Sequence, residues 1–176
     1  MANFSIKFPK NCICSLERRF LFIQIANMQS KVTKTLQPGQ LIARGVARHL
    51  HSLGYVSLKE FAPTRGLRVD IMALGPKGDL WIIECKSSRA DFVVDHKWQN
   101  YLAWSDKFFW AVDEDFPTDI LPSKNGLIIA DAYDAAIIRK APQNAIASMR
   151  RRSLIHKFAM KAAERLHNLQ NSEFKI

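Results

Sequence analysis

Three charged residues lie inside the most hydrophobic hairpin that the sequence predicts. Residues 68–88, RVDIMALGPKGDLWIIECKSS, are typical of two strands joined by a tight turn. Asp70 falls within the first strand, and Glu84 and Lys86 fall within the second. Buried strands rarely contain charge unless it is paired. Two carboxylates beside an ammonium can hold a divalent cation and act on a phosphodiester, which is the chemistry that this pattern suggests.

The register of the hairpin decides whether these side chains can meet. If residues 75–79 form the loop, Asp70 pairs with Glu84 and Lys86 follows on the same face, with the Cβ atoms of the two acids about 4.5–5.5 Å apart. Opposed carboxylates repel, and bound Mg²⁺, which prefers oxygen ligands, removes that penalty. The Lys86 ammonium can then hold or deprotonate the attacking water, or stabilise charge on the phosphate. The other face of the hairpin would carry Val69, Ile71, Ala73, Trp81, Ile83 and Cys85.

A purely structural role is the alternative interpretation of the same residues. An isolated E-x-K triplet is common in chains of this length. Asp70 could lie at the end of a strand while Lys86 only neutralises Glu84 on a solvated face. The catalytic interpretation is favoured by the opposed acid, the apolar strands around it, the helix signal that follows and the basic charge of the chain.

Composition and charge narrow the class of protein. The chain has 176 residues and a formal net charge of +10, with 26 Lys and Arg against 16 Asp and Glu. This length fits one domain with a real core, and the charge favours polyanionic partners, nucleic acid first and an anionic membrane surface second. No segment approaches the roughly 20 apolar residues of a membrane span, and FLFIQIA (20–26) is too short for a signal sequence. We therefore expect a cytoplasmic protein that does not bind membranes.

Hydrophobic periodicity predicts an α/β fold in which the hairpin is central. The expected order is α-β-β-β-α-β, a mixed sheet flanked by helices, followed by a second hairpin and a long basic helix. We expect residues 38–176 to form a single domain and 1–37 to be an N-terminal extension, with Met28 a natural start. The expected elements are a helix closed by Gly54, strands at 55–62, 68–74 and 80–86, a helix over 88–105, a strand at 107–113, a hairpin at 125–140 and a helix over 144–170.

The motif residues also resemble a known group of enzymes. Asp70 followed by Glu84, Cys85 and Lys86 resembles the PD-(D/E)xK nuclease superfamily, whose restriction-endonuclease-like core has the order α-β-β-β-α-β. More closely, the run from Arg68 to Val112 resembles the MmcB-like family of DNA repair endonucleases, over roughly 38–170 in all.

The resemblance implies a set of roles. It implies that Asp70 and Glu84 bind Mg²⁺, which Mn²⁺ can replace, that the backbone carbonyl of Cys85 is a further ligand, and that Lys86 is catalytic. Many superfamily members also carry an acid on the first helix. The helix predicted here has none, so Glu60 is the candidate for an additional metal ligand.

Other residues are candidates for contacts with the substrate. If 88–105 is one helix, its spacing places four residues in one stripe: Val93, Lys97, Tyr101 and Trp104. Lys97 could then contact phosphate, and Tyr101 could supply an orienting hydroxyl. A surface lysine and a packed tyrosine are the alternative. Arg68 could touch phosphate or pair with an acid. On the last helix we expect Arg150, Arg151 and Arg152 to contact the DNA backbone, or else to form a solvated face.

These observations lead to one expected function and two alternatives. The expected function is a metal-dependent DNA endonuclease in DNA repair. The alternatives are a catalytically idle DNA-binding accessory protein and an RNA-directed nuclease. We expect no small-molecule cofactor, and a homodimer is compatible with the sequence.

Overall fold

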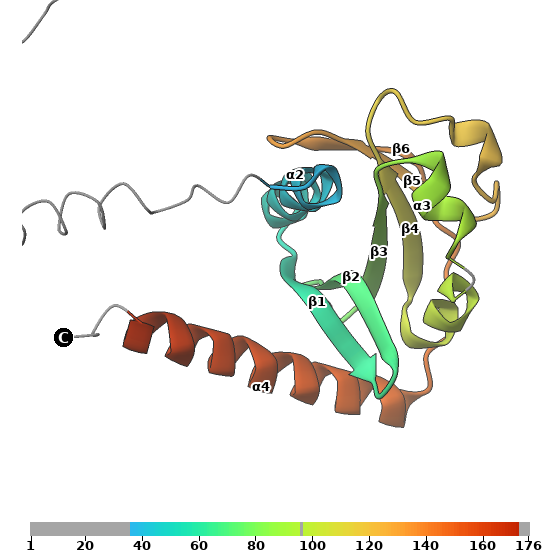
Figure 1. Ribbon diagram of the computed structural model, residues 1–176. Helices are drawn as coiled ribbons and strands as arrows, with labels where there is room; N and C mark the ends of the chain where they lie inside the picture. The colour runs from blue at the N-terminus through green and yellow to red at the C-terminus, as the bar shows by residue number, and fades with distance from the viewer. Residues whose placement is uncertain (1–35, 96, 173–176) are drawn as a thin grey trace, which may run out of the picture. The chain divides into compact units, whose positions relative to one another are not determined.

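A computed structural model describes residues 36–95 and 97–172 (Figure 1). The predicted extension, including Met28, lies outside these residues except at its last two positions. The described chain forms a six-stranded sheet in the order β1-β2-β3-β4-β5-β6. β1, β2 and β3 are antiparallel, β3, β4 and β5 are parallel, and β6 returns antiparallel to β5. The strands are β1 (Val56–Thr64), β2 (Leu67–Leu74), β3 (Leu80–Lys86), β4 (Lys107–Val112), β5 (Gly126–Ala130) and β6 (Ala135–Arg139).

Helices cover both faces of the sheet. α2 (Pro38–Ser52) packs on one face, and α3 (Arg89–Val93) and the 3₁₀ helix η1 (Trp98–Trp104) lie over the other (Figure 1). η2 (Thr118–Ile120) follows β4, and α4 (Ser148–Ser172) runs past β1. The predicted mixed sheet with flanking helices, consistent with a restriction-endonuclease-like core, is confirmed. No helix within the described residues is long and apolar enough to cross a membrane.

The sequence explains where α2 begins and ends. Pro38 occupies its first turn, where a missing N–H is tolerated, and the backbone N–H of Gln37 donates to Gln40 Oε1 at 3.0 Å. Gly54 follows the cap residue Leu53 with a φ of 81°, a conformation that favours glycine. The buried side of α2 includes Ile42, Val46 and Leu50, which pack on the sheet. This packing fixes the helix above the central hairpin.

The helix predicted over 88–105 is broken into two elements. Ser88 caps α3 as expected, with its Oγ accepting from the Asp91 N–H at 3.2 Å. α3 nevertheless ends at Val93, and η1 begins only at Trp98. Two consecutive β-branched residues at 93–94 favour a break, and the Trp98 ring then packs on the aromatic core of the sheet. The predicted stripe of Val93, Lys97, Tyr101 and Trp104 is therefore wrong.

The hairpin has the predicted register but not the predicted faces. Pairing runs from Leu74–Leu80 to Ile71–Ile83, as expected, and stops there. Val69 lies in the core with Met72, on the face opposite Ile71, so the alternation of sides breaks between residues 69 and 71. The neighbouring strand bends at the same level, where Glu60 has a φ of 50°. The predicted ladder pair of Asp70 with Glu84 is therefore not formed, and the shared face of Val69 and Ile71 was a wrong expectation.

Candidate functional site

A hollow of about 560 Å³ lies between the first turns of α2 and strands β1 to β3. We call it the site hollow. It brings together five of the predicted site residues, of which Glu60 comes from β1. Its lining residues are Leu36, Gln37, Gly39, Gln40, Ala43, Lys59, Glu60, Asp70, Glu84, Cys85, Lys86, Ser87 and Asp91.

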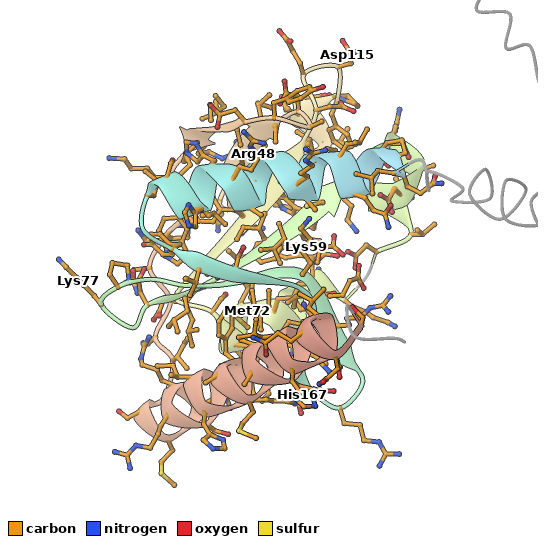
Figure 2. All side chains as sticks on the ribbon, turned by 90° about the vertical axis from the view of Figure 1, so that its left-hand side faces the viewer. Arg48, Lys59, Met72, Lys77, Asp115 and His167 are labelled. Carbon is orange, nitrogen blue, oxygen red and sulfur yellow. The ribbon has the colours of Figure 1, made fainter. Side chains whose placement is uncertain are left out.

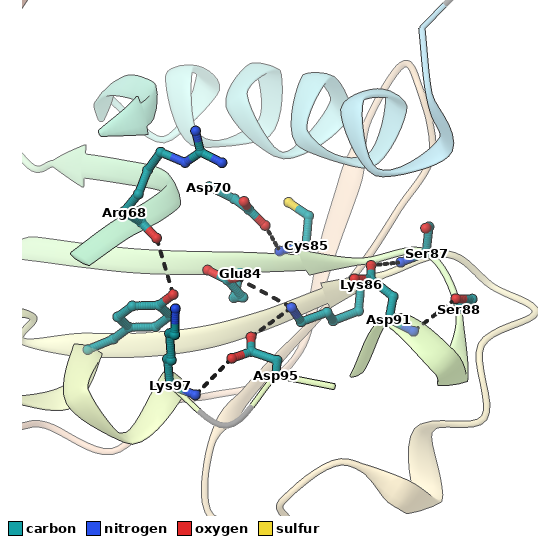
Figure 3. Close-up of polar contacts among 11 residues, drawn as sticks. Arg68, Asp70, Glu84, Cys85, Lys86, Ser87, Ser88, Asp91, Asp95 and Lys97 are labelled. Atoms are coloured by element: carbon teal, nitrogen blue, oxygen red, sulfur yellow. Dashed lines mark hydrogen bonds and ion pairs between the residues drawn. The ribbon is translucent and has the colours of Figure 1, made fainter. Parts of the chain in front are cut away.

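Asp70 lies in β2 directly beyond the last residue of this strand that pairs with β3. Its Oδ2 accepts a hydrogen bond from the backbone N–H of Cys85 at 2.8 Å, beyond the last paired residues of the two strands (Figure 3). Burial raises the pKa of this carboxyl, although the Cys85 N–H and the Lys86 charge act to lower it. The N–H and C=O of one strand residue point to the same side, so the Cys85 carbonyl is directed toward β2 as well.

Glu84 reaches the hollow from inside the sheet. The residue is 6% exposed, and its pKa is raised to about 8, first by burial and then by the charge of Asp70. Its Oε2 atom is buried and has no hydrogen-bond partner in the described part of the chain. A buried carboxylate oxygen without a partner is costly and calls for an explanation, such as an ion that the site is built to receive.

Lys86 is held between two acids. Its Nζ lies 2.7 Å from Asp95 Oδ2 and 3.5 Å from Glu84 Oε1, and the lysine is 5% exposed (Figure 3). Burial acts to lower the pKa of Lys86, but the hydrogen bond with Asp95 and the charges of both acids outweigh it and raise the pKa. Asp95 was not found from the sequence, because a continuous helix over 88–105 gives no reason for this acid to turn inward.

The other candidates, on η1 and β2, are not among the residues that line the hollow. The Tyr101 hydroxyl donates to the backbone carbonyl of Arg68 at 3.1 Å, so this buried residue ties η1 to β2. Lys97 is exposed at the start of η1, where its backbone N–H donates to Asp95 Oδ1 at 3.0 Å. The Arg68 guanidinium pairs with Glu60 at 3.0 Å between two exposed side chains. Of the two open possibilities for Arg68, the structure shows the ion pair.

The three consecutive arginines of α4 do not form a uniform surface. The Arg151 guanidinium makes a double hydrogen bond to the carboxylate of Asp106, a residue that is 1% exposed. Arg150 stacks over Trp104, with its Cζ 4.7 Å from the ring centroid, and donates to the Ala103 carbonyl at 2.7 Å. Arg151 therefore anchors α4 to the sheet, a role that the sequence did not indicate, and the expected DNA contact of the three arginines stays a prediction. Arg152 is exposed.

The site hollow offers a limited set of ligands for a metal ion. Within residues 36–95 and 97–172, no group of three or more His, Cys, Asp or Glu side chains is placed to hold a metal. Asp70 and Glu84 supply two carboxylates, and Cys85 supplies a backbone carbonyl. Mg²⁺ is usually bound through one or two carboxylates with water and phosphate oxygens completing its shell, so this donor set fits that ion.

Comparisons with known proteins identify one similar structure and one family. The solved structure titled "SPO1766 protein of unknown function from Silicibacter pomeroyi" is 60% identical, with a TM-score of 0.78, over 81% of this chain and 97% of that one. No curated protein matches the chain. The family described as "DNA repair protein MmcB-like" matches residues 27–173, a range that contains the whole sheet and the site hollow. The chain therefore belongs to the MmcB-like family of DNA repair proteins.

Proposed function

We propose that this protein is a metal-dependent endonuclease that hydrolyses phosphodiester bonds of DNA during repair. The observation that carries the proposal is the buried Oε2 of Glu84, which has no hydrogen-bond partner among the described residues and lies in the same hollow as Asp70. The resemblance of Asp70, Glu84 and Lys86 to the PD-(D/E)xK motif supports it. Membership of a DNA repair family supports the choice of substrate.

Three groups of the chain would hold the ion. Asp70, Glu84 and Cys85 all line the site hollow, and the Cys85 N–H donates to Asp70, so two carboxylates and a backbone carbonyl are the groups available there. Bound there, Mg²⁺ would neutralise the two acids and act as a Lewis acid toward a phosphate oxygen. The first turns of α2 line the same hollow, and the N-terminal end of a helix favours the negative charge of a phosphate.

Lys86 would stabilise the negative charge that develops on the phosphate in the transition state. Asp95 and Glu84 hold its Nζ in place, so the ammonium is ready before substrate arrives and needs no rearrangement during the reaction. Two acids around one Nζ favour the charged form, which donates hydrogen bonds and does not take a proton. We therefore assign Lys86 to stabilising charge on the phosphate, one of the roles that the sequence left open.

Metal binding and cleavage test the proposal with one set of proteins. Titration calorimetry with Mg²⁺ and Mn²⁺ should show binding to the wild type and to Lys86→Ala, and none to Asp70→Asn or Glu84→Gln. All three variants should lose cleavage in a panel of single-stranded, duplex, flap, abasic and damaged DNA together with RNA. Metal binding without cleavage of any substrate would favour a catalytically idle accessory protein. Preferential cleavage of RNA would favour an RNA-directed nuclease. Absence of metal binding in the wild type would overturn the proposal.

A further inference from the structure

A second hollow adjoins the site hollow along the same helix. It has a volume of about 500 Å³ and is lined by Arg44, Ala47, Arg48, His51 and Lys59, and we call it the basic hollow. Lys59 lines both hollows, so the two meet at this side chain. Figure 2 looks onto this side of the molecule, with α2 above β1 and Lys59 between them.

The basic hollow follows one face of α2. Gln40 and Ala43 line the site hollow, and residues 44, 47, 48 and 51 continue the same side of the helix over the next two turns. Arg44 and Arg48 are four residues apart, which places their side chains on neighbouring turns about 5–6 Å apart at Cβ. A row of cations therefore leads away from the two acids of the site.

The cations of the basic hollow are available to a ligand. Arg44, Arg48 and Lys59 are exposed and make no hydrogen bond or ion pair with any described residue. On the other side of β1, three cations of α4 are bonded to protein groups. Lys157 donates to the Pro63 carbonyl at 3.3 Å, Lys161 pairs with Glu164 at 2.8 Å, and Arg165 donates to the Glu60 carbonyl at 3.3 Å.

We propose that the nucleic-acid strand carrying the scissile phosphate leaves the site along α2, with its phosphates held by Lys59, Arg44 and Arg48. This inference rests on the proposed function. It adds the route of the strand beyond the site and the positive charges that bind its phosphates. No Phe, Tyr or Trp is among the described residues that line the basic hollow, so its charged side chains favour contacts with phosphates over stacking on large aromatic rings. Phosphate contacts without base contacts carry no sequence information, and binding along this path is sequence-independent and salt-sensitive.

The test measures binding and does not depend on cleavage. Fluorescence anisotropy follows a labelled single strand and the matching duplex, without metal and with Ca²⁺, over a range of salt concentrations. The variant R44Q/R48Q/K59Q should bind the single strand with a salt slope smaller by about 2, because each phosphate contact contributes about 0.7 to that slope. The same relation gives about a hundredfold weaker binding at 0.1 M salt, with the difference vanishing near 1 M.

A variant with the same loss of charge elsewhere is the control. K77Q/K124Q/K140Q removes three exposed lysines from loops outside both hollows and should bind like the wild type. Thermal melting of both triple variants at the temperature of the wild type establishes that neither is misfolded. Equal affinity and slope in R44Q/R48Q/K59Q and wild type would overturn the inference, and so would failure of the wild type to bind either DNA at low salt. Mg²⁺ titration of the same proteins reports on the proposed function separately, so either conclusion can fail without the other.

Discussion

Asp95 places its Oδ2 atom 2.7 Å from the Nζ atom of Lys86, inside a site where both side chains are largely buried. The lysine comes from the end of β3, and the aspartate comes from the segment between α3 and η1. The break in the predicted helix is therefore what brings the partner of Lys86 into the site. Removing one member of a buried ion pair leaves an uncompensated charge, so this contact should matter for both stability and catalysis.

The variant Asp95→Asn should separate metal binding from turnover. Asp70 and Glu84 are unchanged in this variant, so the affinity for Mg²⁺ should stay within a few-fold of wild type. Turnover should fall by about 10- to 100-fold, because Lys86 loses the group that orients it. Calorimetry and initial rates measure the two effects, and Asp115→Asn, which removes an exposed charge, is the control. Unchanged turnover would show that Asp95 does not position Lys86.

The raised pKa of Glu84 predicts how the metal-free protein responds to pH. A carboxyl whose pKa is raised to about 8 in the fold stabilises the protein while it is protonated. That contribution is fully present below the ordinary pKa of glutamate and is lost as the pH rises through about 8. The free energy of unfolding of wild type should therefore fall between about pH 5 and pH 9 more steeply than that of Glu84→Gln, whose amide does not ionise.

Urea unfolding in a chelator, repeated across that pH range, measures the difference between the two proteins. Adding Mg²⁺ at the upper end of the range should restore stability to the wild type and leave Glu84→Gln unchanged, because the ion binds only the carboxylate pair. Parallel pH curves for the two proteins would contradict the assignment of the raised pKa to Glu84.

The strands of the fold were predictable because local signals define them. β3 was expected at 80–86 and is observed there, since an apolar run is bounded by a turn on one side and a helix cap on the other. The hairpin register from Leu74–Leu80 to Ile71–Ile83 follows from the length of the loop alone. The convergence of Asp70, Glu84 and Lys86 in one hollow could therefore be anticipated from spacing.

The geometry within the site could not be predicted, because distant contacts determine it. The side chains of β2 stop alternating between the two faces of the sheet at Asp70, at the level where the neighbouring strand bends at Glu60. Neither residue is of a type that indicates this irregularity in the sequence. The break between α3 and η1 depends on aromatic packing of Trp98 against β4. Asp106 binds Arg151, which is 45 positions away in the chain, and no local pattern indicates that contact.

The pair of Asp106 and Arg151 should be a major contributor to stability. Asp106 also accepts a hydrogen bond from the Leu80 N–H at 2.7 Å, so its carboxylate joins α4 to the start of β3. Arg151→Ala leaves this buried acid unpaired and should lower the free energy of unfolding by about 3–5 kcal/mol. Arg152→Ala, at an exposed position, should change it by less than about 0.5 kcal/mol.

Low pH should remove the stability that the pair of Asp106 and Arg151 contributes. Burial acts to raise the pKa of Asp106, but the hydrogen bonds from Arg151 and the Leu80 N–H outweigh it and lower the pKa. The stabilisation is therefore present above the ordinary pKa of aspartate and is lost as the pH falls through the lowered value. Urea unfolding at neutral pH and at about pH 3 should show a smaller difference between wild type and Arg151→Ala in acid. An Arg151→Ala protein as stable as Arg152→Ala at neutral pH would contradict the role of the pair.

A close contact between α2 and the turn that joins β5 to β6 holds the helix over the site. Gly45 faces the turn between β5 and β6 so closely that an added Cβ would lie 2.1 Å from the Asp131 carbonyl oxygen and 2.6 Å from that of Asp134. Both neighbours are backbone atoms, so the helix or the turn must move to admit a methyl group. Gly45→Ala should lower the free energy of unfolding by about 1–3 kcal/mol, although alanine is the better helix former.

Gly39 provides a matched control within the same helix, because an added Cβ there meets nothing within 4 Å. Gly39→Ala should leave stability unchanged or raise it by up to about 1 kcal/mol. The first turns of α2 line the site hollow, so displacement of the helix by Gly45→Ala should also weaken Mg²⁺-dependent cleavage, whereas Asp70 and Glu84 remain in place to bind the ion. Equal stability of the two alanine variants would show that the close approach of α2 to the β5–β6 turn is not maintained in solution.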